Sequence, residues 1–238
     1  MTRGSQPWRE VCVALALAAA LSAPRGPLQA QDVAYAASLP DLDSATQVVV
    51  GREIAHARER GLPVDPLIAK VREGRLKRAP GGRIRAAVER LGERLGAARD
   101  ALGAASTPEE VTAGADAIAA GAQPSSLRAL RAASAQPVTA PIGALAQLLA
   151  SGVSETRAME IVLSLLRRNA SPAVLIALAN QVEADVSTGL SAAASAAFRL
   201  RALENHLNAA ATAEAATGFE NLGGNVNSGT GSAPRRKP

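Results

Sequence analysis

The segment from Ser154 to Gly189 reads SETRAMEIVLSLLRRNASPAVLIALANQVEADVSTG, and it indicates how the chain folds. A serine opens a new part of it three times, at Ser154, Ser171 and Ser187, at nearly equal intervals. Serine is a favoured helix N-cap because its hydroxyl accepts hydrogen bonds from free backbone N–H groups. Pro172 suits a first helical position, and Asn169 suits a helix stop. The segment therefore predicts short capped helices, and its serines are explained without a catalytic role.

Similar helix starts recur along most of the chain. Candidate caps stand at similar intervals, at Thr107, Ser125, Thr139, Ser154, Ser171 and Ser187. Thr107 is followed by Pro108, and Glu110 completes a capping box. Asp65 is expected to cap a helix that starts with Pro66. The expected stops are the glycines Gly61, Gly74, Gly121 and Gly152.

Residues 44–217 are predicted to form one all-α domain. Alternating β-branched runs, which strands need, are missing, and the valines at 48–50 are the only local exception. Each capped unit holds about three turns, which is too short to be stable alone, so neighbouring helices must stack. We expect an α-solenoid-like repeat array, with an irregular helical bundle as the alternative.

A longer helix carries a heptad pattern. Its apolar residues are spaced alternately four and three positions apart, at Ile84, Val88, Leu91, Leu95, Ala98 and Leu102. Such a seam suits an ordinary core-facing helix and also, as a second interpretation, a dimeric coiled coil.

The two ends of the chain lie outside the predicted domain. Residues 1–30 have a basic opening and an apolar run from Val11 to Ala23, which is typical of a signal peptide cleaved after Ala30. The protein is therefore expected to be exported, periplasmic or secreted, and not transmembrane after cleavage. Cleavage would remove Cys12, the only cysteine. Residues 31–43 are interpreted as a linker, and residues 218–238, rich in Gly, Asn and Ser, as a disordered tail.

The residues that catalysis needs are sparse. Glu53 and His56 have the spacing of a metal-ligand pair, but His206 has Leu203 where a second glutamate would stand. Acidic neighbours occur at Glu109–Glu110 and at Glu183 and Asp185, and they are better explained as structural groups. We expect neither enzymatic activity nor a metal or other cofactor.

One basic segment, residues 70–85, is the candidate binding site. It holds one acid, Glu73, and seven basic residues: Lys70, Arg72, Arg75, Lys77, Arg78, Arg83 and Arg85. Such a surface could hold an anionic envelope polymer or an anionic lipid surface. The bland alternative is a solvated helical surface. Nucleic acid is not expected, because no aromatic residues are interleaved with the cations.

The region around this segment resembles uncharacterised, exported, all-helical bacterial proteins. The similarity covers about residues 60–95. Its marks are the GLP turn at 61–63, the L-x-x-K-x-x-E-G pattern at 67–74 and the I-x-x-x-V-x-x-L pattern at 84–91. The resemblance implies a helical envelope protein and carries no known activity. We expect a helical-repeat scaffold or protein-interaction module with an unknown protein partner; the alternative is an electrostatic binder that uses residues 70–85.

Overall fold

The computed structural model describes residues 42–223, and all regular structure in that part of the chain is helical. The nine helices are α2 Ser44–Glu59, α3 Asp65–Leu76, α4 Gly81–Leu102, α5 Pro108–Ala119, α6 Pro124–Ala133, α7 Thr139–Ala150, α8 Glu155–Arg167, α9 Pro172–Ser187 and α10 Ala192–Gly223. The all-α prediction is confirmed. The valines at 48–50 lie inside α2, where Val50 is fully buried.

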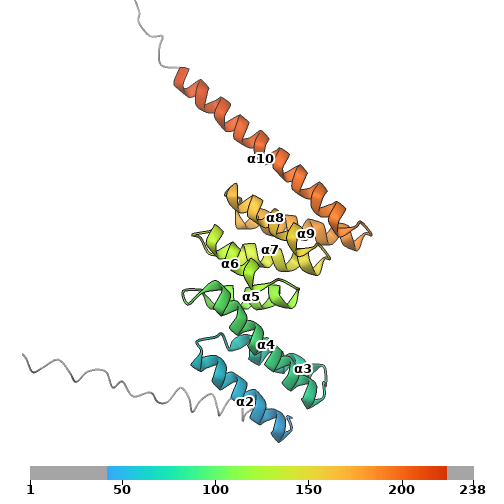
Figure 1. Ribbon diagram of the computed structural model, residues 1–238. Helices are drawn as coiled ribbons and strands as arrows, with labels where there is room; N and C mark the ends of the chain where they lie inside the picture. The colour runs from blue at the N-terminus through green and yellow to red at the C-terminus, as the bar shows by residue number, and fades with distance from the viewer. Residues whose placement is uncertain (1–41, 224–238) are drawn as a thin grey trace, which may run out of the picture.

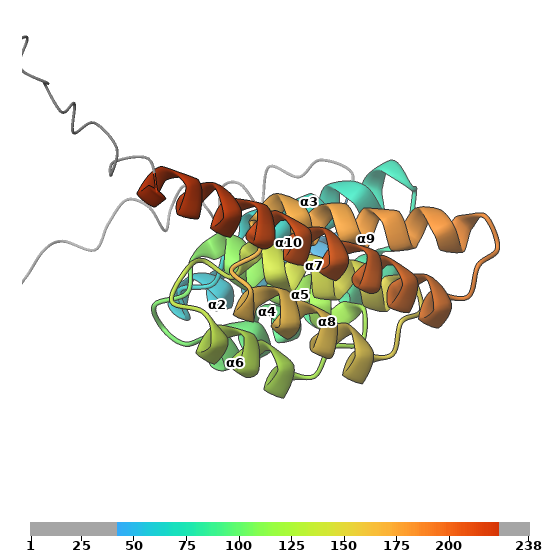
Figure 2. The same cartoon turned by 90° about the horizontal axis from the view of Figure 1, so that it is seen from above.

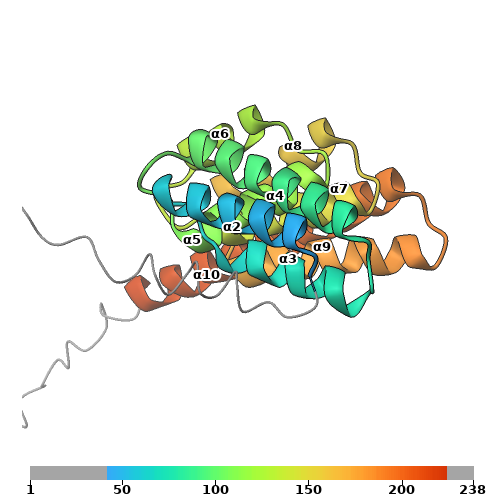
Figure 3. The same cartoon turned by 90° about the horizontal axis from the view of Figure 1, so that it is seen from below.

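The helices are stacked in chain order along one direction. Figure 1 shows the stack rising from α2 through α5 to α10. Helix α5 contacts α7 and α7 contacts α9, while α4 contacts α6 and α6 contacts α8. The views along the stack show α6 and α8 on one side of it, away from α9 (Figures 2 and 3). This order of contacts favours a repeat array, in which each unit packs on its neighbours; the array remains our interpretation.

One apolar cluster runs through the stack, from Val50 in α2 to Leu200 in α10. The heptad seam of α4 belongs to it: each of its six apolar residues, from Ile84 to Leu102, is buried. The seam is therefore used within the chain, against the neighbouring helices, as expected for a core-facing helix.

Six of the eight connections between the described helices share one local geometry, the Schellman motif. In each, a residue with positive φ follows the helix, and its N–H and the next N–H both bond to carbonyls of the last turns. At Gly152, for example, its N–H bonds to Leu149 O at 2.9 Å and the N–H of Val153 to Leu148 O at 3.0 Å. The left-handed residues are Gly61, Arg78, Gly121, Gly152, Asn169 and Gly189.

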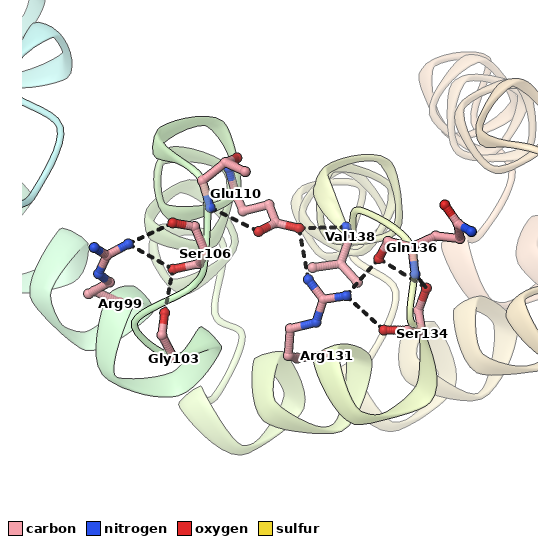
Figure 4. Close-up of polar contacts among 9 residues, drawn as sticks. Arg99, Gly103, Ser106, Glu110, Arg131, Ser134, Gln136 and Val138 are labelled. Carbon is pink, nitrogen blue, oxygen red and sulfur yellow. Dashed lines mark hydrogen bonds and ion pairs between the residues drawn. The ribbon is translucent and has the colours of Figure 1, made fainter.

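The other two connections are held by arginine side chains (Figure 4). Between α4 and α5, Arg99 Nη1 donates to the carbonyl of Ser106 at 2.6 Å. Between α6 and α7, Arg131 Nη2 donates to the carbonyls of Ser134 at 2.7 Å and Gln136 at 2.6 Å. Side-chain bonds thus add to the backbone bonds of these two connections, where no Schellman motif forms.

The cap predictions are partly correct. Thr107 and Glu110 form the predicted capping box. Ser154 and Ser171 occupy N-cap positions with the extended backbone conformation of a cap. Their hydroxyl groups make no cap hydrogen bond, unlike the prediction. The left-handed stops at Gly61, Gly121, Gly152 and Asn169 are confirmed.

Ser125, Thr139 and Ser187 are not caps. Gln123 and Val138 precede α6 and α7 instead, which leaves Ser125 and Thr139 inside the first turns. Ser187 ends α9 and donates to Ala184 O at 2.7 Å, and α10 begins after Ser191, whose hydroxyl accepts from the N–H of Ala194 at 3.3 Å. With these corrections the caps of α5 to α9 are more evenly spaced than predicted, at Thr107, Gln123, Val138, Ser154 and Ser171.

Two predictions about α3 are wrong. Val64 precedes the helix, and Asp65 is its first residue. Gly74 lies inside the helix and is not its stop. A Cβ at Gly74 would stand 2.8 Å from Cγ1 of Ile84, so this glycine permits the close approach of α3 to α4.

Ordered contacts and helical structure extend beyond residues 44–217 at both ends. Leu42 packs against the core and Asp43 caps α2, so the last two residues of the predicted linker belong to the fold. Helix α10 continues to Gly223, past the predicted end at Thr217, because a single glycine at 218 costs only about 1 kcal/mol in a helix. The signal peptide 1–30, the rest of the linker and the tail beyond 223 lie outside the described residues.

Candidate anion-binding site between α3 and α4

The basic segment forms the end of a helical hairpin, made of the last turns of α3, the connection 77–80 and the first turn of α4. The close approach at Gly74 and Ile84 brings the two helices together at this end. The connection is a Schellman motif whose left-handed residue is Arg78, with φ of 52°. At the other five motifs this position is held by glycine or asparagine, which tolerate it better.

Two of the seven predicted cations are paired with the one acid of the segment. Lys70 Nζ and Lys77 Nζ each lie 2.5 Å from a carboxylate oxygen of Glu73, at spacings of i,i+3 and i,i+4 along α3. Hydrogen bonds from Lys70 and then Lys77 lower the pKa of Glu73 to about 2. Glu73 is therefore ionised at neutral pH and offsets one of the two lysine charges.

Arg85 is directed toward α2. Its Nη1 donates to Oγ1 of Thr46 at 2.8 Å and lies 3.6 Å from Oδ1 of Asp43. Hydrogen bonds from Thr46 lower the pKa of Asp43, the N-cap of α2. Arg85 thus helps to fasten α2 to α4. Arg83 is exposed in the first turn of α4 and does not line the pocket described next.

Arg72, Arg75 and Arg78 are brought together around one open pocket. The pocket has a volume of about 700 Å³, and its remaining lining residues are apolar: Leu42, Leu76, Ala79 and Ile84. Acidic side chains do not line it in the described part of the chain. Three of the seven predicted residues therefore share a surface suited to an anion, because guanidinium groups donate hydrogen bonds in a planar fork. We call this set the arginine pocket.

Leu76 was missed by the sequence analysis. It is 86% exposed, the highest value among the exposed large apolar side chains of residues 42–223. The signal was available: Leu67 and Val71 lie four residues apart on the buried face of α3, and Leu76 stands off that face between two cations.

The carboxylates weighed as catalytic pairs have structural partners. Hydrogen bonds to the Glu109 carboxylate, first from its own backbone N–H and then from the Thr107 hydroxyl, lower the pKa of Glu109. Glu183 accepts from Nε2 of Gln147 at 2.6 Å and so joins α9 to α7.

Asp185 is held by α10: Arg199 Nη2 and Ser195 Oγ donate to it at 2.7 Å each. These bonds, that of Arg199 first, lower the pKa of Asp185 to about 2.

The two histidines lie apart, His56 in α2 and His206 in α10, and both are exposed. Within residues 42–223, no three side chains of the metal-binding types come together at one place. None of the helices in the same range is both long and apolar enough to cross a membrane.

Comparison of the chain with protein-family models, with curated proteins and with solved structures found no match.

Proposed function

We propose that this protein is a helical scaffold, or protein-interaction module, of the bacterial envelope, exported by residues 1–30 and without catalytic activity. The observation that supports a scaffold best is the way the connections are closed. Six are closed by their own backbone, and the other two by Arg99 and Arg131. A stack closed in this way presents large surfaces in a constant arrangement, which suits the binding of another protein.

Export can be tested in the native cell. The protein is tagged at its C-terminus, and the mature N-terminus is sequenced from each cell fraction. We expect a chain that begins at Gln31 in the periplasmic or secreted fraction. A chain that begins at Met1 and stays in the cytoplasm would overturn the proposal of export.

The interaction role needs a test that reports position on the stack. A photo-crosslinking residue replaces Val48 in α2 or Phe198 in α10, which are 60% and 63% exposed and belong to the helices at opposite ends of the stack. The control is the same residue at Gly143, which is exposed in α7 with open space around it. A scaffold should give an adduct of one defined mass from some positions and not from others. Adducts of equal amount at all three positions, or none, would argue against it.

A second function is favoured by the arginine pocket. Three guanidinium groups line one open pocket, and no acidic side chain of residues 42–223 lines it, which supports electrostatic binding of anionic envelope polymer or lipid. Such binding must weaken steeply as salt rises and must be lost when Arg72, Arg75 and Arg78 are changed to glutamate. Binding that is indifferent to both changes would exclude this function and leave the scaffold untouched.

A further inference from the structure

We infer that the arginine pocket is a docking site for the surface of a bilayer that contains anionic lipid. In this arrangement the side chain of Leu76 inserts among the headgroups, and Arg72, Arg75 and Arg78 bind lipid phosphates. The inference rests on the second function proposed above and narrows it to one partner and one mode of contact.

The apolar part of the argument is the position of Leu76. Single exposed leucines are common on protein surfaces and need no explanation alone. Leu76, however, is 86% exposed and shares the pocket wall with three arginines and with Leu42 and Ile84. An exposed apolar side chain that shares a pocket with cations suits a membrane interface, where hydrocarbon and charged headgroups meet.

The cationic part of the argument is the chemistry of the three arginines. Each guanidinium carries five N–H donors, and its charge is retained at all physiological pH values. Arg72 and Arg75 also take part in other interactions within the molecule, and they keep their positive charge there. Arg78 and Arg72 are exposed, so their long side chains can follow the headgroup layer.

A bilayer fits this surface better than a free anion or a polymer does. Phosphate or a charged polysaccharide would pair with the arginines and leave Leu76 in water. A lipid surface supplies phosphates and hydrocarbon within one thin layer, and so matches both kinds of side chain at once. Lys70 and Lys77, on another face of α3, add long-range attraction that Glu73 only partly offsets.

The test measures binding of the full chain to sedimenting vesicles of phosphatidylcholine, with or without about one third phosphatidylglycerol. The triple variant Arg72→Gln, Arg75→Gln, Arg78→Gln removes the guanidinium groups. Its matched control, Arg52→Gln, Arg128→Gln, Arg167→Gln, removes the same charge from exposed positions elsewhere. Because every variant retains residues 1–41, any membrane affinity of the N-terminal apolar run is the same in all of them.

We expect the triple variant to lose about 100-fold in affinity for anionic vesicles, at roughly fivefold for each cation near a charged surface. The control should lose far less. Leu76→Ser should cost about tenfold, the loss of one partly inserted leucine. Glu73→Gln should bind more tightly, by about fivefold, because Lys70 and Lys77 are then no longer offset.

Several results would overturn the inference. Equal losses in the triple variant and its control on anionic vesicles would exclude the pocket. The bilayer would be excluded, and a simple anion site would remain, if two results came together. Leu76→Ser would bind vesicles as well as the wild type does, and inorganic phosphate or dextran sulfate would displace the protein fully from the vesicles. If the triple variant unfolds, as circular dichroism will show, the exposed pair Arg72→Gln, Arg78→Gln gives the same test with an expected loss of about 25-fold.

Discussion

Glu110 and Arg131 form an ion pair of 3.0 Å between α5 and the last turn of α6. The same oxygen of Glu110 accepts from the N–H of Val138 at 2.8 Å, and the other accepts from the N–H of Thr107 at 3.0 Å. Glu110 is only 2% exposed, so these bonds hold in a place that water scarcely reaches. Three successive helices, α5, α6 and α7, are therefore joined at one carboxylate (Figure 4).

Replacing Glu110 with alanine should lower the free energy of unfolding by about 3 kcal/mol, because Arg131 and two backbone N–H groups lose their partner. Urea denaturation at neutral pH measures the change. The matched control is Glu109→Ala, which removes the exposed neighbouring carboxylate and should have a much smaller effect. An equal loss of unfolding free energy in the two variants would show that Glu110 does not hold α5, α6 and α7 together.

Gly114 and Gly143 should respond in opposite directions to alanine. A Cβ at Gly114 would stand 2.9 Å from Cβ of Ala98, and α5 would have to move off α4, at a cost of about 1–3 kcal/mol. A Cβ at Gly143 meets nothing within 4 Å, and alanine there should stabilise the helix by about 0.5–1 kcal/mol. Thermal unfolding of both variants checks the pair; a gain at Gly114 would contradict the close packing of α4 and α5.

The sequence predicts the helices well because their stops are local signals. A left-handed residue is usually glycine or asparagine, and five of the six Schellman motifs follow that rule. The cap residues are harder to predict, since Gln123 and Val138 take cap positions without a side-chain cap bond, and their N–H groups bond to Glu155 and Glu110, which lie far away in the sequence. Gly74 is wrongly predicted as a helix stop, because a glycine can either end a helix or allow another helix to pack closely against it. Only the distance to Ile84 distinguishes the two roles.

Arg78 is the exception to the glycine rule, and we expect it to lower stability. Arg78→Gly should stabilise the protein by about 0.5–1 kcal/mol, because glycine takes the left-handed conformation without steric cost. The same change should weaken binding to anionic vesicles by about fivefold. Gly152→Ala, at φ of 88°, is the control: it should destabilise by about 1 kcal/mol and leave vesicle binding unchanged. If Arg78→Gly binds vesicles normally, the left-handed arginine has no part in docking.

Asp185 should contribute to stability in a defined range of pH. Its pKa is lowered from 3.8 to about 2 by Arg199 and Ser195, so its contribution is complete above pH 4 and is lost as the pH falls toward 2. The difference in unfolding free energy between wild type and Asp185→Asn should therefore shrink over that range. Urea denaturation at a series of pH values measures it, and Arg199→Leu should show the same trend. A difference that stays constant down to pH 2 would contradict the assignment.

The candidate site was predicted less well than the fold. The cations of 70–85 were identified as a group, but helical phase divides them: Lys70, Glu73 and Lys77 share one face of α3, and Arg72 and Arg75 reach another. The spacing of these residues along α3 is enough to predict that division. The place of Leu42 in the pocket wall could not be predicted in this way, because it depends on how α2 packs on α4 through Asp43, Thr46 and Arg85.

The Schellman connections have a consequence for how such a chain can change in length. The two backbone bonds that define each motif lie within a short run of successive residues. A helix with its connection can therefore be duplicated or deleted as one block, and the blocks on either side keep their own closure. The connection between α6 and α7 is different. Arg131 and the N–H of Val138, at its two ends, both bond to Glu110 in α5. Natural length variants are thus expected to keep α5, α6 and α7 together, because these helices share Glu110.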